Sequence, residues 1–259
     1  MKRLAAMAAI LGLSLLCGRA WAEDPIRFGF SDESYPPFYA KDQAGKFTGW
    51  EVELMDLVCA EMKSSCTITP VGWDGMIPSL LQHRIDVIWA SMSITPDRLQ
   101  VIAFTDRYYF SPNIFIGPKA VPVGIDFGKL DGLKGLSVGV QSATIHASYL
   151  AKHFDGTVEA KLYDTFDNAT ADLIAGRIDL VFADKISLET FMKSGQGRDM
   201  EVKATAPPDP LLGNGVGGGL RKEDTALKAR LDAALAAIRR DGRYDALAKR
   251  YFDFDIYGR

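Results

Sequence analysis

Residues 73–86, WDGMIPSLLQHRID, and residues 166–179, FDNATADLIAGRID, are two copies of one pattern that stand 93 positions apart. An aromatic residue, Trp73 or Phe166, opens each copy, and both copies end in Arg-Ile-Asp before an apolar run, VIWA or LVFA. This separation is far longer than the repeat of a solenoid. The sequence therefore predicts two lobes of the same design, each with a helix that leads into a buried strand.

The rest of the chain alternates short β-branched or aromatic runs with longer helical patterns, which is typical of α/β folds with mostly parallel sheets. Strands are expected at residues 26–30, 67–71 and 85–90, and helices at residues 51–62 and 77–82. An open sheet of this kind binds ligands beyond the carboxyl ends of its strands. Ser91 and Ser93 follow one repeated strand, and Asp184 follows the other in register with Ser91. A polar cleft is therefore expected between the lobes.

The first 22 residues carry the features of a cleaved export signal. Lys2 and Arg3 precede an apolar run at residues 4–16, and residues 20–22, AWA, follow as a small-x-small cleavage site. The run is shorter than the ~20 residues that span a bilayer, which argues against a membrane anchor. Cleavage removes three of the 30 basic residues and none of the 33 acidic ones, so the mature chain carries a net charge of −6. Such a charge, without a basic patch, does not favour nucleic acid as a partner.

Cys59 and Cys66 are the cysteines that remain after this cleavage, and an oxidising compartment makes their pairing the default expectation. Their spacing is not that of a Cys-x-x-Cys redox site, and no histidine lies nearby to complete a metal site. We expect a structural disulfide that stabilises the fold by about 2–3 kcal/mol.

Motifs distributed over the whole mature chain resemble those of the family-3 amino-acid solute-binding proteins of bacterial ABC uptake transporters, in particular the lysine/arginine/ornithine and histidine binders. The matching stretches are residues 35–38 (YPPF), 49–54 (GWEVEL), 74–80 (DGMIPSL), 93–98 (SITPDR), 103–105 (AFT), 175–179 (AGRID), 219–224 (GLRKED) and 251–255 (YFDFD). The resemblance implies an α/β fold of the type II periplasmic binding protein kind, with two lobes joined by hinge strands near residues 109–113 and 206–210. Lobe one then comprises residues 23–110 and 208–259, and lobe two comprises residues 113–207. The resemblance also implies a periplasmic monomer that uses no cofactor and delivers a small molecule to a membrane permease.

The resemblance assigns the two charges of an amino acid to residues from both lobes. Arg98, in the first turn of a helix entered through Pro96, matches the family's carboxylate anchor, and a guanidinium grips a carboxylate through two parallel hydrogen bonds. Asp184 matches the acceptor of the α-ammonium group, and Ser91 and Ser93 complete its hydrogen bonds. Helix capping is the structural alternative for the two serines.

The strand-to-helix turn at residues 138–146, VGVQSATIH, is expected to offer backbone N–H groups to the same carboxylate. Thr144 and Ile145 are the ligand-binding positions of this turn. The sequence departs from the family at Ala143, where glycine is usual, and at Ile145, where a threonine or serine hydroxyl is often present. A third departure is Ala90, where close relatives often carry serine. We expect affinity or ligand choice to differ as a result.

Tyr35 and Trp73 are expected to form walls around the ligand side chain, since a flat aromatic ring covers a guanidinium or a methylene chain well. Asp32 matches the acidic position that meets the distal cation in relatives that bind basic amino acids, and its neighbour Glu33 could substitute. The preferred ligand is therefore expected to be arginine, lysine, ornithine or histidine. Opines, which carry a substituted amino group, and glutamine are the alternatives within the same fold.

Two other functions stay open at this point. The fold also carries a periplasmic cyclohexadienyl dehydratase, but the sequence shows no nucleophile–base pair, so no catalytic residue is expected. The sensor domain of a receptor is the other alternative. His146 and His153 are seven positions apart without further ligands, so no metal site is expected, and His146 is a candidate neighbour of the cleft.

Overall fold

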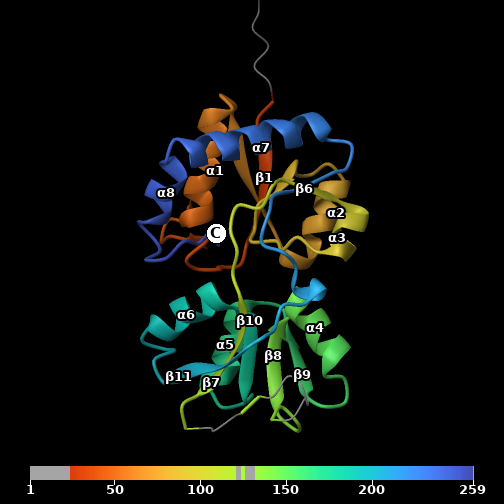
Figure 1. The fold of residues 1–259 in the computed structure, drawn as a ribbon, viewed down its shortest axis with the longest axis vertical. Coiled ribbons are helices and arrows are strands. Elements are labelled where there is room, and N and C mark those ends of the chain that lie inside the picture. Colours follow the sequence, from red (N-terminus) through yellow and green to blue (C-terminus); the bar gives the residue numbers. More distant parts are fainter. Residues whose placement is uncertain (1–23, 121–123, 126–131, 259) are drawn as a thin grey trace, which may run out of the picture.

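The computed structural model describes residues 24–120, 124–125 and 132–258. The predicted signal peptide, residues 1–22, lies outside these residues. The described part folds into two α/β lobes, one above the other in Figure 1, and two stretches of chain cross between them. Within it, every helix is too short or too polar to cross a membrane.

Each lobe is built on a five-stranded sheet. If the fourth strand is left out, the other four strands follow one another in the same chain order in both sheets. The first sheet runs β4 (Cys66–Val71), β1 (Ile26–Ser31), β5 (Val87–Ile88), β12 (Gly219–Leu220), β6 (Ala103–Phe104). The second runs β9 (Glu159–Tyr163), β8 (Ser137–Gln141), β10 (Leu180–Asp184), β7 (Asn113–Pro118), β11 (Met200–Thr205). In both sheets the first three strands are parallel and the fourth is antiparallel to its neighbours. The prediction of two lobes with mostly parallel sheets is confirmed.

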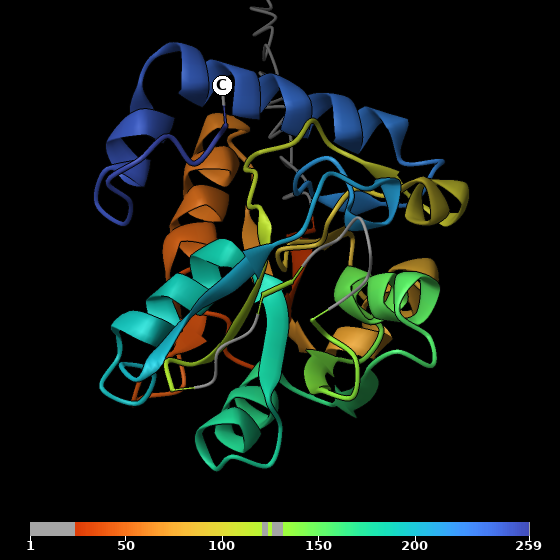
Figure 2. The same ribbon diagram turned by 60° about the horizontal axis from the view of Figure 1, so that its bottom comes forward.

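Helices flank both sheets. The first lobe contains α1 (Trp50–Glu61), α2 (Met76–Leu81), α3 (Pro96–Val101), α7 (Thr225–Arg240) and α8 (Arg243–Ala248), and the second contains α4 (Ile145–His153), α5 (Phe166–Ile174) and α6 (Lys185–Lys193). A short hairpin, β2 (Ala40–Lys41) and β3 (Phe47–Thr48), precedes α1. Helix α7 packs across α1 at the end of the first lobe that faces away from the second (Figures 1 and 2). The chain therefore returns to the first lobe after it has completed the second sheet.

The two copies of the repeated pattern occupy equivalent places in the two lobes. Helix α2 leads to β5, and α5 leads to β10, and both strands are third in their sheets. The strand predicted over residues 85–90 is shorter than expected, because the chain leaves the sheet before Ser91, whose backbone is left-handed with φ 56°. The crossings lie between β6 and β7 and between β11 and β12. The lobe boundaries at residues 110, 207 and 208 fall within these crossings, and residue 113 is the first residue of β7; these boundaries stay a prediction.

Each lobe has its own hydrophobic core. The first lobe is held by one cluster that includes the fully buried Trp50 and Trp89. The second lobe has a cluster on each face of its sheet, because successive residues of a strand point to opposite faces. Phe182 thus stacks on Phe115 at 4.0 Å on one face, whereas Val181 packs on the other.

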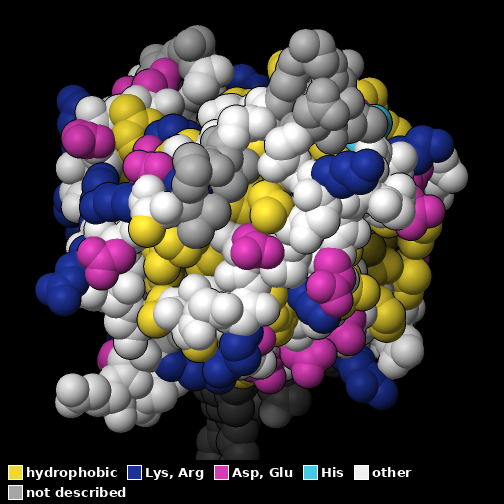
Figure 3. Space-filling view, turned by 90° about the horizontal axis from the view of Figure 1, so that it is seen from below, with side chains coloured by type: hydrophobic (Ala, Val, Ile, Leu, Met, Phe, Trp, Pro, Cys, Tyr) yellow, Lys and Arg dark blue, Asp and Glu magenta, His cyan; other side chains and the backbone are white. Residues whose placement is uncertain are grey.

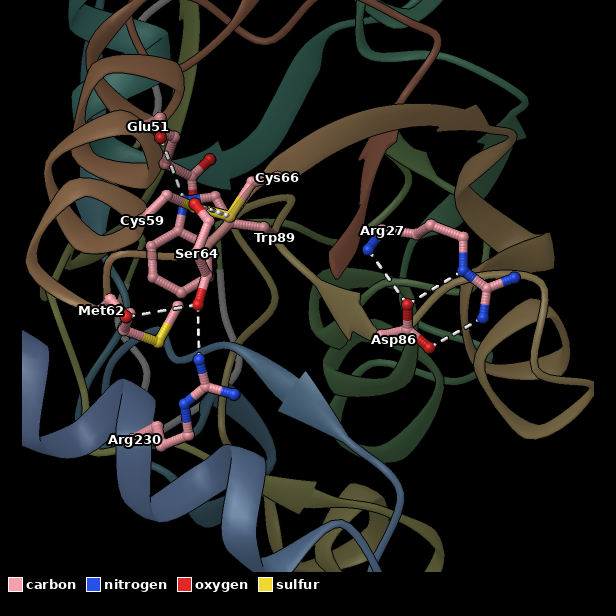
Figure 4. Close-up of a disulfide and its surroundings, with 9 residues drawn as sticks. All are labelled: Arg27, Glu51, Cys59, Met62, Ser64, Cys66, Asp86, Trp89 and Arg230. Atoms are coloured by element: carbon pink, nitrogen blue, oxygen red, sulfur yellow. Dashed lines mark hydrogen bonds and ion pairs between the residues drawn. A yellow bond between two sulfur atoms is a disulfide. The ribbon is translucent and has the colours of Figure 1, made fainter. Parts of the chain in front are cut away.

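A disulfide joins Cys59 of α1 to Cys66 at the start of β4, with Cα atoms 6.3 Å apart (Figure 4). The predicted pairing is confirmed. Nearby, Arg27 of β1 donates from Nε and Nη2 to Asp86, at 2.9 and 2.8 Å, and ties the first strand to the segment before β5. These links lie at the amino ends of β4, β1 and β5, which is the end of the strands away from the cleft.

On the face of the second lobe that lies away from the first, acidic and basic side chains lie among apolar ones (Figure 3). Charges of both signs therefore alternate over the part of this face that the structure describes.

Candidate functional site

A cavity lies between the two lobes and takes its lining from both. Nine of the ten predicted ligand-binding residues line it: Tyr35, Trp73, Ala90, Ser91, Ser93, Arg98, Thr144, Ile145 and Asp184. It encloses about 550 Å³ of space that no atom fills, a figure that includes its open mouth. The tenth residue, Asp32, is not part of the lining.

The fold brings these residues together because the carboxyl ends of both sets of parallel strands face the cleft. The repeated pattern contributes three equivalent pairs to the lining: Trp73 and Phe166, Ala90 and Ala183, Ser91 and Asp184. Phe166 was not assigned to the site from the sequence, although its place opposite Trp73 pointed to it. The site is therefore built from corresponding positions of two similar lobes.

Arg98 is the cation of the cavity. Thr95 caps α3 by accepting the backbone N–H of Arg98 at 3.3 Å, and Pro96 occupies the first turn, so the arginine is held at the start of the helix. Its Nη1 donates to the Ser93 carbonyl at 2.9 Å, and its guanidinium lies 5.7 Å from the Trp73 ring. Burial lowers the pKa of Arg98 to about 10, while the charge of Asp184 acts in the opposite direction. The guanidinium is thus a largely desolvated cation at neutral pH, which suits an anionic ligand group.

Asp184 is the carboxylate that faces Arg98 from the other lobe. It ends β10 and is buried, and its Oδ2 accepts the Tyr35 hydroxyl at 2.7 Å. Burial raises the pKa of Asp184 to about 6, whereas the Tyr35 hydrogen bond and the charge of Arg98 lower it. Within the described residues, no hydrogen bond reaches its Oδ1. One carboxylate oxygen therefore stays available to a donor in the cavity.

Ser91 and Ser93 are buried at the end of the first repeated strand. The backbone N–H and the hydroxyl of Ser91 both donate to Glu51, at 2.9 and 2.8 Å. Neither serine caps α3, because Thr95 takes that role. The structure thus favours the cavity over the capping alternative, and it adds Glu51, which the sequence analysis had not singled out.

The turn before α4 adopts the expected strand-to-helix geometry. Ala143 has a left-handed backbone, with φ 56°, which accounts for the glycine that the family prefers there. The hydroxyl of Thr144 donates to the Gln141 carbonyl at 2.6 Å and accepts the Ala147 N–H at 3.3 Å. Ile145 packs its side chain in the core of the second lobe. The N–H groups that open α4 are therefore what this turn can offer to an anion.

His146 lies in the cavity wall, as the sequence had suggested for a cleft neighbour. Its Nε2 is 2.7 Å from Asn113 Oδ1, so this nitrogen carries the hydrogen, and its ring meets Phe182 edge-on at 4.9 Å. Burial lowers the pKa of His146 to about 3, and the charge of Arg98 acts in the same direction. The imidazole is therefore neutral. Within residues 24–120, 124–125 and 132–258, no group of three His, Cys, Asp or Glu side chains could hold a metal ion.

The aromatic walls also join the lobes across the cavity. Besides its bond to Asp184, Tyr35 meets the Phe166 ring edge-on at 5.4 Å. Trp73 donates from Nε1 to the Ala143 carbonyl of the second lobe at 3.3 Å. The cleft is thus in a closed arrangement.

Asp32 lies outside the cavity, in the segment that follows β1. Ser31, the last residue of the strand, is buried, whereas Asp32 is exposed. Glu33 is half-buried and accepts the Ser31 hydroxyl. Burial raises the pKa of Tyr39, a cavity residue, and the charges of Glu51 and then Glu33 add to this effect. Of the two neighbours Asp32 and Glu33, it is therefore Glu33 whose charge acts on a residue of the lining.

Comparisons with known proteins agree with this site. Residues 26–254 match the family of bacterial extracellular solute-binding proteins, family 3. The lysine/arginine/ornithine-binding periplasmic protein of Escherichia coli strain K12 is 37% identical over 96% of this chain and 98% of its own length. The L-arginine-binding protein of Pseudomonas aeruginosa is 36% identical over 100% and 99% of the two chains. The solved structure of an ancestral arginine-binding protein bound to arginine superposes with a TM-score of 0.81 at 27% identity, and the match covers 89% of this chain and 99% of that one.

The match extends over nearly all of the mature chain, and the cavity lies where two similar sheets present the ends of their parallel strands. On both grounds, the chain belongs to the family-3 extracellular solute-binding proteins of bacteria.

Proposed function

We propose that the protein is the solute-binding component of an ABC uptake system and that it binds a free L-amino acid between its lobes. The observation that carries this proposal is the pair of opposite charges, Arg98 and Asp184, which different lobes present to one buried cavity. An amino acid carries a carboxylate and an ammonium group on the same α-carbon and so neutralises both charges of the site. The similarity to a lysine/arginine/ornithine-binding protein and to an L-arginine-binding protein supports this class of ligand.

The ligand carboxylate is assigned to Arg98 and to the start of α4. The guanidinium has five N–H donors, and within the described residues one hydrogen bond, to the Ser93 carbonyl, engages it. The N–H groups of Ile145 and His146 open a nine-residue helix, whose positive end attracts an anion. Two independent sets of donors thus converge on one anionic group.

The α-ammonium group is assigned to Asp184 together with Ser91. Asp184 is buried and has one oxygen that no described residue engages, and Ser91 lies at the corresponding position of the other lobe. A substituted, bulkier amino group, as in opines, would have less room beside a carboxylate that Tyr35 already contacts. A primary amino group is therefore preferred.

The ligand side chain is assigned to the space between Tyr35 and Trp73, and we propose that it carries a positive charge. Aromatic faces suit a guanidinium or a methylene chain. The distal carboxylate is proposed to be Asp32 or Glu33; Glu33 is favoured by its effect on Tyr39, and Asp32 by its position in the family motif.

Closure then follows from contacts that only the bound state makes. The ligand bridges groups of both lobes, so it favours the closed arrangement by its differential contacts. We propose lobes of residues 23–110 with 208–259 and of residues 113–207. We also propose that the mature protein works in the periplasm as a monomer and hands its ligand to a membrane permease.

A thermal-shift panel on the mature protein tests this function. Arginine, lysine, ornithine, histidine, glutamine and an opine are compared over a range of concentrations. Ligand that binds the native state alone raises stability by about 4 kcal/mol at a thousandfold excess over its Kd. We expect a cationic amino acid to give the largest shift, and we expect no product from prephenate or arogenate, since we propose no catalytic role. The absence of a shift with every amino acid would contradict the proposal.

A further inference from the structure

We propose that Glu51 is a positioning residue of the binding site, which turns the Ser91 hydroxyl into a pure acceptor and thereby makes the site select a ligand with an α-ammonium group. The inference rests on the proposed function and adds a residue that does not line the cavity itself. Glu51 lies behind Ser91 and is fully buried.

The fold fixes Glu51 in place through the start of α1. Gly49 precedes the helix with φ 122°, and a Cβ there would lie 2.4 Å from the Phe38 carbonyl oxygen, so glycine is required. The close approach lets the Glu51 N–H donate to the same carbonyl at 2.9 Å. Glu51 is thereby anchored to the segment that follows Tyr35, and its carboxylate points into the interior of the first lobe.

The carboxylate fixes Ser91 through two bonds. Oε1 accepts the Ser91 N–H at 2.9 Å and Oε2 accepts the hydroxyl at 2.8 Å. Ser91 has a left-handed backbone with φ 56°, a conformation that non-glycine residues keep only where their surroundings enforce it. The two bonds to Glu51 are what enforces it.

The direction of the hydroxyl bond follows from hydrogen count. An ionised carboxylate only accepts, so the single hydrogen of the Ser91 hydroxyl is committed to Glu51. What the Ser91 oxygen presents to the cavity is then lone pairs. A ligand ammonium group can donate a hydrogen bond to these lone pairs. A ligand oxygen that carries no hydrogen is itself an acceptor and cannot form a hydrogen bond with the Ser91 oxygen.

The surroundings of Glu51 make this arrangement depend on pH. Burial raises the pKa of Glu51 to about 7, the bonds from Tyr108 and Ser91 lower it, and the charge of Asp184 raises it. The phenols that face it, Tyr39, Tyr108 and Tyr109, have pKa values raised well above their usual range and stay neutral. Above pH 7 Glu51 is ionised and directs the Ser91 hydrogen, while below pH 7 its own proton releases that hydrogen toward the cavity.

Glu51→Gln is the sharpest test, because the amide keeps the shape but donates its N–H to the Ser91 oxygen and reverses the bond. The probes are L-arginine with δ-guanidinovalerate, L-lysine with ε-aminocaproate, and L-glutamine with glutaramate, where the second of each pair lacks the α-amino group. The pair whose amino acid binds the wild type is measured by calorimetry. We expect the variant to weaken the amino acid about tenfold or more and to leave the deaminated partner nearly unchanged, because a hydrogen bond to a charged group is lost.

Glu51→Asp keeps the negative charge and is expected to retain the preference for the amino acid over its deaminated partner. In the wild type, the affinity for the amino acid should rise between about pH 6 and pH 8, as Asp184 and then Glu51 ionise. In Glu51→Gln, the rise near pH 7 should be lost, and the rise near pH 6, which is due to Asp184, should remain. Equal weakening of both probes, or unchanged affinity for both, would overturn the inference.

If Glu51→Gln fails to fold, Tyr108→Phe decides. This change removes a hydrogen bond that lowers the pKa of Glu51 and leaves both Ser91 bonds in place. The loss of affinity at low pH should then move to higher pH with the maximal affinity retained, and an unmoved profile overturns the inference. If the wild-type protein binds no amino acid, both the proposed function and this inference are contradicted. If the wild type and Glu51→Gln bind the amino acid with the same affinity, the inference alone is contradicted.

Discussion

Arg98→Ala should abolish amino-acid binding and leave the stability of the ligand-free protein almost unchanged. The guanidinium makes one hydrogen bond within the described residues, to the neutral Ser93 carbonyl, and it lies in surroundings that disfavour its charge. Its removal takes away that bond and a desolvated cation together. We therefore expect the free energy of unfolding to change by less than about 1 kcal/mol.

The loss of affinity should be much larger. A guanidinium that grips a carboxylate makes two charge-assisted hydrogen bonds, each worth about 1.5–3 kcal/mol when the groups are buried. A loss of about 3–5 kcal/mol corresponds to a rise in Kd of roughly two to four orders of magnitude. Arg98→Lys keeps the charge but not the parallel bonds and should lie between wild type and alanine.

Calorimetry with arginine and lysine measures Kd, and urea denaturation measures stability. Arg27→Ala is the matched control: its guanidinium is paired with Asp86 in the first sheet and does not line the cavity. That control should lose about 1 kcal/mol of stability, since the pair is partly exposed, and should bind normally. Near-native affinity of Arg98→Ala, or a stability loss larger than that of Arg27→Ala, would refute the reasoning.

Three further outcomes are expected. Burial raises the pKa of Asp184 from 3.8 to about 6, so its ionisation destabilises the ligand-free fold as pH rises through that range; Asp184→Asn should gain stability relative to wild type between pH 4 and pH 8 in denaturation curves, and a constant difference would contradict this. Replacing Cys59 and Cys66 by alanine should lower the free energy of unfolding by about 2–3 kcal/mol and leave Kd unchanged, and undiminished stability would speak against a structural role. Asp32→Asn and Glu33→Gln, compared by calorimetry, should reduce the preference for arginine over glutamine in at least one case, and an unaltered preference in both removes the cationic assignment.

The two-lobe architecture could be predicted because the same helix-to-strand pattern occurs twice in the sequence. The repeated pattern places Trp73 and Phe166, and likewise Ser91 and Asp184, at corresponding positions, and all four line the cavity. Hydrophobic periodicity placed α1, β1 and β4 to within one residue, whereas the short strands β2 and β3 were not predicted. These features depend on local sequence and on the ends of strands, which a pattern can reveal.

What could not be predicted depends on contacts between distant segments. Glu51 stands 40 residues before Ser91, and nothing near it in the sequence shows that the two side chains meet. His146 of α4 is paired with Asn113 of β7, 33 residues earlier in the chain. Asp32 and Glu33 are neighbours in the segment after β1, and the sequence pattern did not show which of the two side chains is the more buried. In the structure it is Glu33.

The bond between Trp73 and Ala143 has an optical consequence. The described residues hold three tryptophans, and Trp50 and Trp89 are fully buried in the core of the first lobe, where movement of the second lobe leaves their surroundings intact. The Trp73 indole, in contrast, donates to a carbonyl oxygen of the second lobe and loses this partner when the lobes separate. Among the described tryptophans, Trp73 is thus the one whose emission we expect to respond to the ligand, and it would report, without any added label, whether the two lobes are in contact.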